Sequence, residues 1–496
     1  MPRIICGLAI LGLVLSLLAA SVAARPAPPV KPQPARPKPG QVPPMVPPVP
    51  PATPPAPVPP VAPTRPEPLE EGYTRLFNGK DFLGWDADPE YWSVKDRAIR
   101  GDVTTAKMPR ESTACVLQLG PLRNFILRLK FRVTDGVCGV VYRCRDAGNR
   151  RVSGYTAEIS GVPGSVGLLM HEGRGALADV GEFVVIDSDG KRQVLGAVAD
   201  KAALARANYY KGKGADETPV WNDYTIIARG NHLVHLINGY QTVELIDNDT
   251  TSRDLEGGLA FQIQPGLPAT VEIRDIRARR LKGDFGDAAR LFTGKDLSGW
   301  TLSSDLLKNT FGAKDGVLTV SGALSGYLRT TQDFASYVLS LQVRHVRPGG
   351  GGVLLRLIGP DKVWPRAIEC QMQPGTMGAV ASLGEFPMTM APPRTADPPA
   401  GKPQAGQRVP GGFPMTVAPP RTADPQAGKP QGDQRAPGEW NRVEMMLDGG
   451  NLEVAVNGLI RSTATGCQDT PGRVGLASRG GAVEYRNIVL IPILRE

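Results

Sequence analysis

The sequence has few of the residues that build metal and redox sites. It contains 4 histidines and 6 cysteines among 496 residues, and no Cys-x-x-Cys pair or Cys/His ligand spacing occurs. A zinc site is therefore not expected, and no metal ligand or cofactor is assigned, although the sequence leaves a divalent metal open. Five cysteines follow residue 24, and we expect most of them to be small buried apolar groups. The alternative is a single disulfide.

An excess of positive charge is missing from most of the chain. The formal net charge is +9, but the segment Met1–Pro66 holds six Lys or Arg and no Asp or Glu, which leaves +3 for the remainder. A nearly neutral body gives no support for a nucleic-acid partner.

Long apolar runs are absent except for one at the start. Ile4–Ala20 is apolar, follows Arg3, and leads into small residues that end at Ala24. This pattern predicts a signal peptide over residues 1–24, and hence a secreted, periplasmic or cell-surface protein. The alternative is an uncleaved membrane anchor, for which the run is slightly short.

Residues 25–70 predict a linker. They contain 21 of the 48 prolines of the chain, all between Pro26 and Pro68. Proline at this density removes backbone donors and fixes φ, so the segment is expected to be disordered, extended and stiff. Attachment to the cell envelope through this stalk is the hypothesis that follows.

A repeated signature organises the rest of the chain. LFNGKDFLGW at Leu76–Trp85 returns as LFTGKDLSGW at Leu291–Trp300. Each copy is followed by a Trp-Asn pair, at Trp221 and at Trp440. The separation of the two copies is too long for a solenoid period and indicates two homologous domains. Asn78 is the first residue of an Asn-Gly-Lys-Asp sequence, whose residue types favour a tight turn, so we interpret the signature as structural. The alternative is that its Trp stacks on a sugar.

The strand pattern predicts an all-β chain. Phe125–Val133 alternates apolar and polar residues, and Gly and Asn stand between further runs of this kind. No long amphipathic helix is evident. We therefore expect two tandem antiparallel β-sandwiches, at residues 72–282 and 287–494.

The second domain contains an internal duplication. Phe386–Gln404 and Phe413–Gln431 are nearly identical and rich in proline. Because a duplicated core strand would disrupt packing, we expect an exposed, disordered insert over about residues 386–436.

These motifs carry a resemblance to a known family. The ten-residue signature, the later Trp-Asn and Asn-Gly pairs and the terminal strand resemble the 3-keto-disaccharide hydrolase domain family (DUF1080) in both copies. The resemblance implies concanavalin A-like jelly rolls that hold carbohydrate on a concave sheet. It also suits an exported protein.

The resemblance further implies a reaction and a site. A ketone at C3 of a sugar acidifies the C2 proton, so that a base can start elimination of the C1 aglycone, followed by hydration. In the family, a strand that ends in Arg is followed by a strand with a central acid, and both point into the concave face. Here these residues are Arg143 and Glu158 in the first copy, and Arg356 and Glu369 in the second. A structural Arg–Glu salt bridge is the alternative.

The first copy is expected to be the active one. The family commonly has a His after its penultimate strand, and both copies lack it. His171 is the candidate catalytic replacement, with simple exposure as its alternative. Residues expected to bind substrate are Tyr155, Glu172, Gln262, Arg356, Glu369 and Gln371.

Three functions are compatible with the sequence. The first is hydrolysis of a 3-keto-glycoside, with a glycan as the partner. The second is carbohydrate binding without turnover, and the third is a cell-surface interaction module on a proline stalk.

Overall fold

The computed structural model describes residues 69–161, 165–199, 204, 220–390 and 434–495. The predicted signal peptide and nearly all of the predicted linker lie outside these residues. No helix among them is long and apolar enough to cross a membrane.

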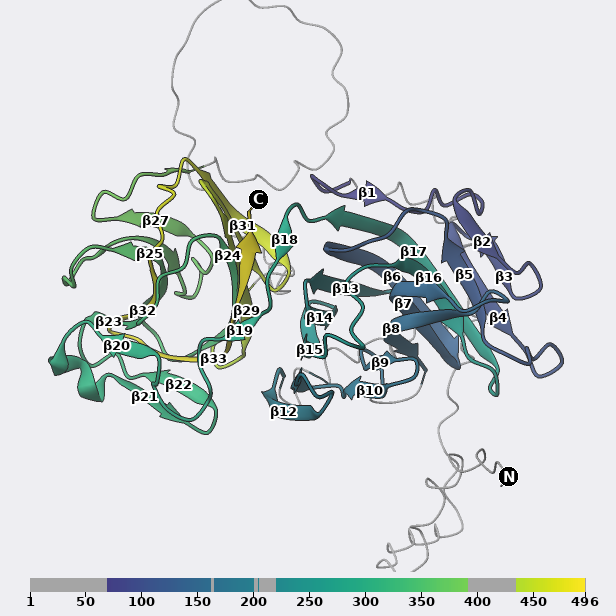
Figure 1. The fold of residues 1–496 in the computed structure, drawn as a ribbon, viewed down its shortest axis with the longest axis horizontal. Helices are drawn as coiled ribbons and strands as arrows, with labels where there is room; N and C mark the ends of the chain where they lie inside the picture. Colours follow the sequence, from purple (N-terminus) through teal and green to yellow (C-terminus); the bar gives the residue numbers. More distant parts are fainter. Residues whose placement is uncertain (1–68, 162–164, 200–203, 205–219, 391–433, 496) are drawn as a thin grey trace, which may run out of the picture. The chain divides into compact units, whose positions relative to one another are not determined.

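The first sandwich consists of two sheets (Figure 1). The larger has the order β12 (Arg192–Ala197), β11 (Glu182–Ile186), β15 (Tyr240–Asp247), β14 (His232–Ile237), β13 (Asn222–Arg229), β6 (Phe125–Asp135), β17 (Ala269–Arg280), β4 (Ala98–Val103) and β3 (Trp92–Lys95), with β1 (Thr74–Arg75) paired to β17. The smaller has the order β10 (Gly175–Ala178), β9 (Leu169–His171), β8 (Val152–Ser160), β7 (Val137–Asp146), β16 (Gly258–Ile263), β5 (Thr113–Leu117) and β2 (Trp85–Ala87).

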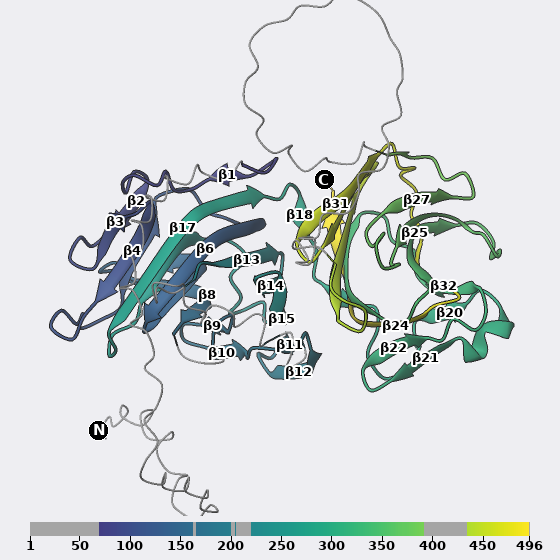
Figure 2. The same cartoon turned by 180° about the vertical axis from the view of Figure 1, so that it is seen from behind.

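The second sandwich repeats this plan. Its larger sheet has the order β21 (Phe311–Lys314), β22 (Val317–Val320), β33 (Ala482–Leu494), β24 (Tyr337–Arg347), β29 (Asn441–Asp448), β30 (Asn451–Val456), β31 (Leu459–Thr465) and β28 (Thr389–Met390), with β18 (Asp284–Phe285) and β19 (Ala289–Arg290) paired to β33. The smaller has the order β20 (Trp300–Leu302), β23 (Gly326–Thr330), β32 (Arg473–Arg479), β25 (Gly350–Ile358), β26 (Arg366–Gln371) and β27 (Val380–Leu383) (Figure 2). A short 3-10 helix, η2, spans Asp305–Asn309.

The fold prediction is confirmed: both halves are jelly-roll β-sandwiches. Apart from the parallel pair β11–β15, the described strand pairs are antiparallel. In β6, the alternate residues Phe125, Leu127 and Leu129 are buried in the core between the sheets. The period of two in the sequence therefore places one face of the strand on the core.

The repeated signature is structural in both copies. The Asn78 side chain accepts hydrogen bonds from the backbone N–H groups of Lys80 and Asp81, which closes the turn. The indole N–H of Trp85 donates to the Leu76 carbonyl at 2.9 Å, and the ring is 6 % exposed. The corresponding Trp300 is 8 % exposed. Buried rings leave no surface for a sugar, so the stacking alternative is wrong.

The Trp-Asn pairs also stabilise the sheets. The guanidinium carbon atoms of Arg132 and Arg274 lie 4.8 and 3.9 Å from the centroid of the Trp221 ring. Arg344 and Arg486 hold the Trp440 ring of the second sandwich in the same way, at 4.7 and 4.1 Å. Each Trp thus links two neighbouring strands of the larger sheet by cation–π contacts.

The start of the predicted insert is folded, which corrects its boundary. Phe386 is 2 % exposed and belongs to the second core. Thr389 and Met390 form β28, which pairs with β31. Residues 391–433 lie outside the described part. All five cysteines after residue 24 are free and buried, so the prediction of apolar thiols is confirmed and the disulfide alternative is wrong.

Candidate functional site

The two faces of the smaller sheet in the first sandwich carry different side chains. Tyr142 of β7, and Ala157 and Ile159 of β8, belong to the core. Val141 belongs to a separate apolar cluster on the face turned away from the core, which we call the outer face. Because Glu158 lies between two core residues of its strand, it also belongs to the outer face.

Arg143 lies on the opposite side from Glu158. A β-bulge interrupts β7 at this point, and Arg143 has φ +50°, so that both Tyr142 and Arg143 are fully buried. Burial lowers the pKa of Arg143 to about 10. Its guanidinium donates to three backbone carbonyls, those of Arg123 (2.7 and 3.0 Å), Gly230 (2.7 Å) and Asp254 (3.1 Å). The prediction that Arg143 and Glu158 share one pocket is wrong.

Arg356 repeats this arrangement in the second sandwich. It has φ +49°, is fully buried, and lies at the corresponding bulge of β25. It donates to the carbonyls of Gln468 and Ala335, and pairs with the Asp469 carboxylate at 2.7 Å. Both arginines therefore hold loops against the sandwich. The prediction that Arg356 shares a pocket with Glu369 is wrong for the same reason.

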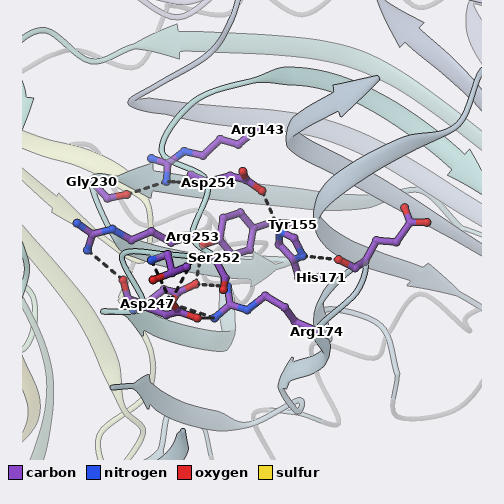
Figure 3. Close-up of polar contacts among 12 residues, drawn as sticks. Arg143, Tyr155, His171, Arg174, Gly230, Asp247, Ser252, Arg253 and Asp254 are labelled. Carbon is purple, nitrogen blue, oxygen red and sulfur yellow. Dashed lines mark hydrogen bonds and ion pairs between the residues drawn. The ribbon is translucent and has the colours of Figure 1, made fainter. Parts of the chain in front are cut away.

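Tyr155 and His171 also lie on the inner side. The Tyr155 hydroxyl donates to the Asp247 carboxylate at 2.7 Å. The His171 ring lies between the Asp254 carboxylate at 2.8 Å and the Glu172 carbonyl at 2.7 Å (Figure 3). Since His171 is 5 % exposed, it is neither exposed nor a group above the sheet. The Glu172 side chain is exposed. The predicted set is thus divided between two faces.

The two glutamates are not in equivalent positions. Gly139 stands four residues before Arg143 and pairs with Glu158. Gly352 stands four residues before Arg356, but it pairs with Gln371. Glu369 is two residues earlier on β26, opposite Leu354. The sequence equivalence of Glu158 and Glu369 is therefore wrong by two residues, which is about 7 Å along a strand.

In the described part of the chain, the outer face of the first sandwich offers few polar groups near Glu158. Gln262 lies in the same row, across Gly139, and its side-chain oxygen accepts from the Val152 N–H at 3.2 Å. The neighbouring cluster is apolar and contains Ala114, Val141, Cys144, Val152 and Ala260.

The outer face of the second sandwich brings together complementary groups. The Arg479 guanidinium forms an ion pair with Glu369 at 3.0 Å, and lies 4.7 Å from the centroid of the Trp364 ring. Trp364 is 58 % exposed, whereas the Glu369 side chain is 3 % exposed. An aromatic ring, a cation and a carboxylate thus follow one another from the solvent to the sheet.

A second group of polar residues adjoins a small pocket on this face, which Tyr327 lines and Arg329 and Asp361 do not. The Tyr327 hydroxyl donates to Asp361 at 3.0 Å, and Arg329 holds both oxygens of that carboxylate at 2.8 Å. Tyr327, Trp364 and Arg479 all line the pocket. Sequence reasoning missed Tyr327, Arg329 and Asp361, and gave Arg479 no role. The available signal was Trp364, which precedes the Glu369 strand in the sequence.

Gly352 makes room for the carboxylate. A Cβ atom at this position would lie 2.5 Å from Glu369 Oε1. Gly352 is therefore part of the site. Burial raises the pKa of Glu369, and Arg479 opposes this shift.

The described residues contain no group of three or more His, Cys, Asp or Glu side chains that could hold a metal ion.

Comparison with known proteins adds one strong similarity. The family model of the 3-keto-alpha-glucoside-1,2-lyase-like domain matches residues 72–279 and 287–491. No curated protein matches.

Three solved structures show a distant likeness. A candidate glycosyl hydrolase from Parabacteroides distasonis is 19 % identical, with 43 % of this chain and 95 % of that chain covered and a TM-score of 0.27. The carbohydrate-binding module CBM66 from Bacillus subtilis is 9 % identical, with 38 % and 93 % covered and a TM-score of 0.24. A β-glucanase from Bacillus licheniformis is 11 % identical, with 40 % and 94 % covered and a TM-score of 0.25. At these scores the likeness carries no argument about activity.

Proposed function

The chain belongs to the family of 3-keto-alpha-glucoside-1,2-lyase-like domains, and from this premise we propose that it binds and processes a glycoside on the outer face of the second sandwich. The observation that carries the proposal is the succession of Trp364, Arg479 and Glu369 from solvent to sheet. An exposed indole suits the apolar face of a sugar ring, and a paired guanidinium and carboxylate suit its hydroxyl groups.

The reaction proposed is cleavage of a 3-keto-glycoside. Glu369 takes the C2 proton, and the electron pair moves to the C3 oxygen, beside the Arg479 cation. The ketone re-forms as the C1–O bond breaks, and the aglycone leaves with a proton from water. Water then adds across C1 and C2, so that the net reaction is hydrolysis. A carboxyl whose pKa is raised by burial is a better base near neutral pH than an exposed one.

The test is turnover of 3-keto-trehalose by the mature protein and two single variants. Glu369→Gln is expected to lower kcat by about 10²–10⁴-fold, because it removes the base. Glu158→Gln is the matched change in the first sandwich and is expected to leave kcat within a few-fold. Loss of turnover in Glu158→Gln alone would place the chemistry in the first sandwich.

Binding without turnover is the second candidate function. The ion pair with Arg479 holds Glu369 in a geometry that also suits recognition of hydroxyl groups. Sugar binding that depends on Trp364, combined with no release of free sugar from 3-keto-trehalose, would favour it.

Export belongs to the same proposal. Residues 1–24 would direct the chain across the membrane, and residues 25–70 would act as a stalk at the cell envelope. N-terminal sequencing of the protein from the cell surface should begin near residue 25, whereas an intact Met1 would contradict cleavage.

A further inference from the structure

A cavity of about 360 Å³ lies in the first sandwich, and neither Glu158 nor Gln262 lines it. Its lining combines one aromatic ring with charged and amide side chains: Asp88, Tyr91, Arg110, Glu111, Asn149 and Arg150. The volume is within the range of ~300–1,000 Å³ that is typical of small-molecule sites.

The cavity occupies the same place as the pocket of the second sandwich. In the first sandwich, Ala114 lies in the row of Gly139, and Gln262 stands between them. In the second sandwich, Tyr327 lies in the row of Gly352, and Ala477 stands between them. Because each glycine stands four residues before the bulge arginine, the two rows correspond. One wall of the cavity is formed by the two residues before Ala114, and one wall of the second pocket by the two residues before Tyr327. The opposite wall is in both cases the loop of the next hairpin, which contains Arg150 or Trp364.

The loop that closes the cavity is held in a defined shape. Asn149 and Arg150 both have positive φ, at +54° and +57°, a conformation that non-glycine residues adopt rarely. Arg150 faces the carboxylates of Asp86 and Asp88 at 3.6 and 3.5 Å. The Ala147 N–H donates to the Arg151 carbonyl at 2.9 Å. A strained loop with several restraints is a feature of preorganised sites.

The charges of the lining indicate a neutral ligand. Two carboxylates, Asp88 and Glu111, are matched by two guanidinium groups, Arg110 and Arg150. No net charge is left to attract an ion, while planar carboxylate, amide and guanidinium groups can each bind a pair of neighbouring hydroxyls. The partly exposed ring of Tyr91 supplies the apolar surface that the C–H face of a sugar requires.

We propose that this cavity is a second saccharide site, which takes one neutral sugar unit and makes the protein bivalent for glycans. Unlike the proposed site of the second sandwich, its lining has no buried carboxylate beside a cation. It therefore binds a sugar without cleaving it.

The experiment is calorimetric titration of the full mature chain with trehalose, cellobiose and maltotriose. It is performed in Trp364→Ala, which removes the aromatic ring of the other site. At least one of these sugars should still bind with one site per chain. Adding Tyr91→Ala, or Asn149→Gly, should raise Kd roughly three- to tenfold, the effect of one lost contact. Glycine at position 149 keeps the positive φ while it removes the amide.

Three results would overturn the proposal. One is no binding of any of the three sugars to Trp364→Ala, and another is binding that neither added substitution weakens. The third is tighter binding of glucuronic acid than of glucose, which would contradict a neutral ligand. Binding that survives in Trp364→Ala and disappears in the Tyr91 variant would support this cavity even if 3-keto-trehalose is not cleaved.

Discussion

Glu158 and Glu369 show how burial and a neighbour decide what one carboxyl can do. Burial raises the pKa of both side chains. Glu369 has a cation at 3.0 Å, whereas a hydrogen bond from Ser165 is what opposes the shift at Glu158. No cation among the described residues opposes the shift at Glu158, and a buried carboxyl in that position is costly to ionise. Ionisation of Glu158 therefore costs stability in a way that depends on pH. At Glu369, the cation is Arg479, which a substrate can also contact.

The first prediction concerns the free-energy cost of ionising Glu158 in the folded state. In the folded state, the pKa of Glu158 is raised above its ordinary value of 4.5, so the folded state binds the proton more tightly than the unfolded state does. The free energy of unfolding therefore falls as the pH rises from about 4.5 through the folded pKa. Glu158→Gln should therefore raise the melting temperature at pH 7. The gain should vanish below about pH 4.5, where both states of the wild type are protonated. Thermal denaturation at pH 4 and pH 7 measures it, and Glu172→Gln, an exposed change, is the control.

The second prediction concerns Gly352. Gly352→Ala places a Cβ atom 2.5 Å from Glu369 Oε1, so the carboxylate must move. We expect a loss of about 1–3 kcal/mol in the free energy of unfolding, together with loss of the Glu369 function. Gly120→Ala, which meets nothing within 4 Å, should change stability by less than about 0.5 kcal/mol. Unchanged activity and stability in Gly352→Ala would contradict the contact.

At the scale of the strand, the bulges of β7 and β25 decide which way the side chains of Arg143 and Arg356 point. Each inserts an Arg with positive φ that turns inward and binds loop carbonyls. The extra residue shifts the alternation, so that residues beyond it no longer face the side that counting from the strand start would give. A catalytic interpretation of Arg143 or Arg356 has to assume that they face outward, and this assumption fails in both copies.

The third prediction follows from the bulge of β7. Arg143→Met fills the space but leaves the carbonyls of Arg123, Gly230 and Asp254 without their donor. Since each unsatisfied buried acceptor costs about 1–3 kcal/mol, we expect a loss of at least about 3 kcal/mol. Urea denaturation would measure it, with Arg145→Met as the control because the Arg145 side chain is 68 % exposed. Equal effects of the two changes would rule out the structural role.

At the scale of the whole molecule, residues 65–496 form one compact unit with two separate main cores. Ion pairs join residues that are distant in sequence within this unit. Glu444 is buried between Arg229 and Arg442. Burial alone would raise its pKa, but the two arginines outweigh burial and bring the pKa to about 2.

The fourth prediction concerns acid sensitivity. Because the folded pKa of Glu444 is depressed, its contribution to stability is present above about pH 4.5 and is lost as pH falls toward 2. Glu444→Gln should lower the free energy of unfolding by about 3 kcal/mol at pH 7, and should flatten its decline between pH 5 and pH 3. Asp305→Asn, at a side chain that is 93 % exposed, should leave both quantities unchanged. A wild-type pH profile in Glu444→Gln would contradict the buried pair.

The fold class and the tandem plan could be predicted without any structure. Alternation of apolar residues depends only on neighbours along one strand, so Phe125, Leu127 and Leu129 could be assigned to one face from the sequence. Turn chemistry is equally local, which is why the structural role of Asn78 was predictable. The repeat of the signature revealed two copies without any knowledge of their contacts.

The site, by contrast, depends on contacts between distant parts of the chain. Whether Glu158 or Gln371 lies opposite the equivalent glycine depends on the register between strands, and register is set by partners that are remote in sequence. The inward turn of Arg143 depends on a bulge and on the carbonyls of Gly230 and Asp254, which belong to much later segments of the chain. The meeting of Trp364 with Arg479 joins a hairpin loop to the penultimate strand. Long-range pairing fixes these positions, and no local pattern encodes it.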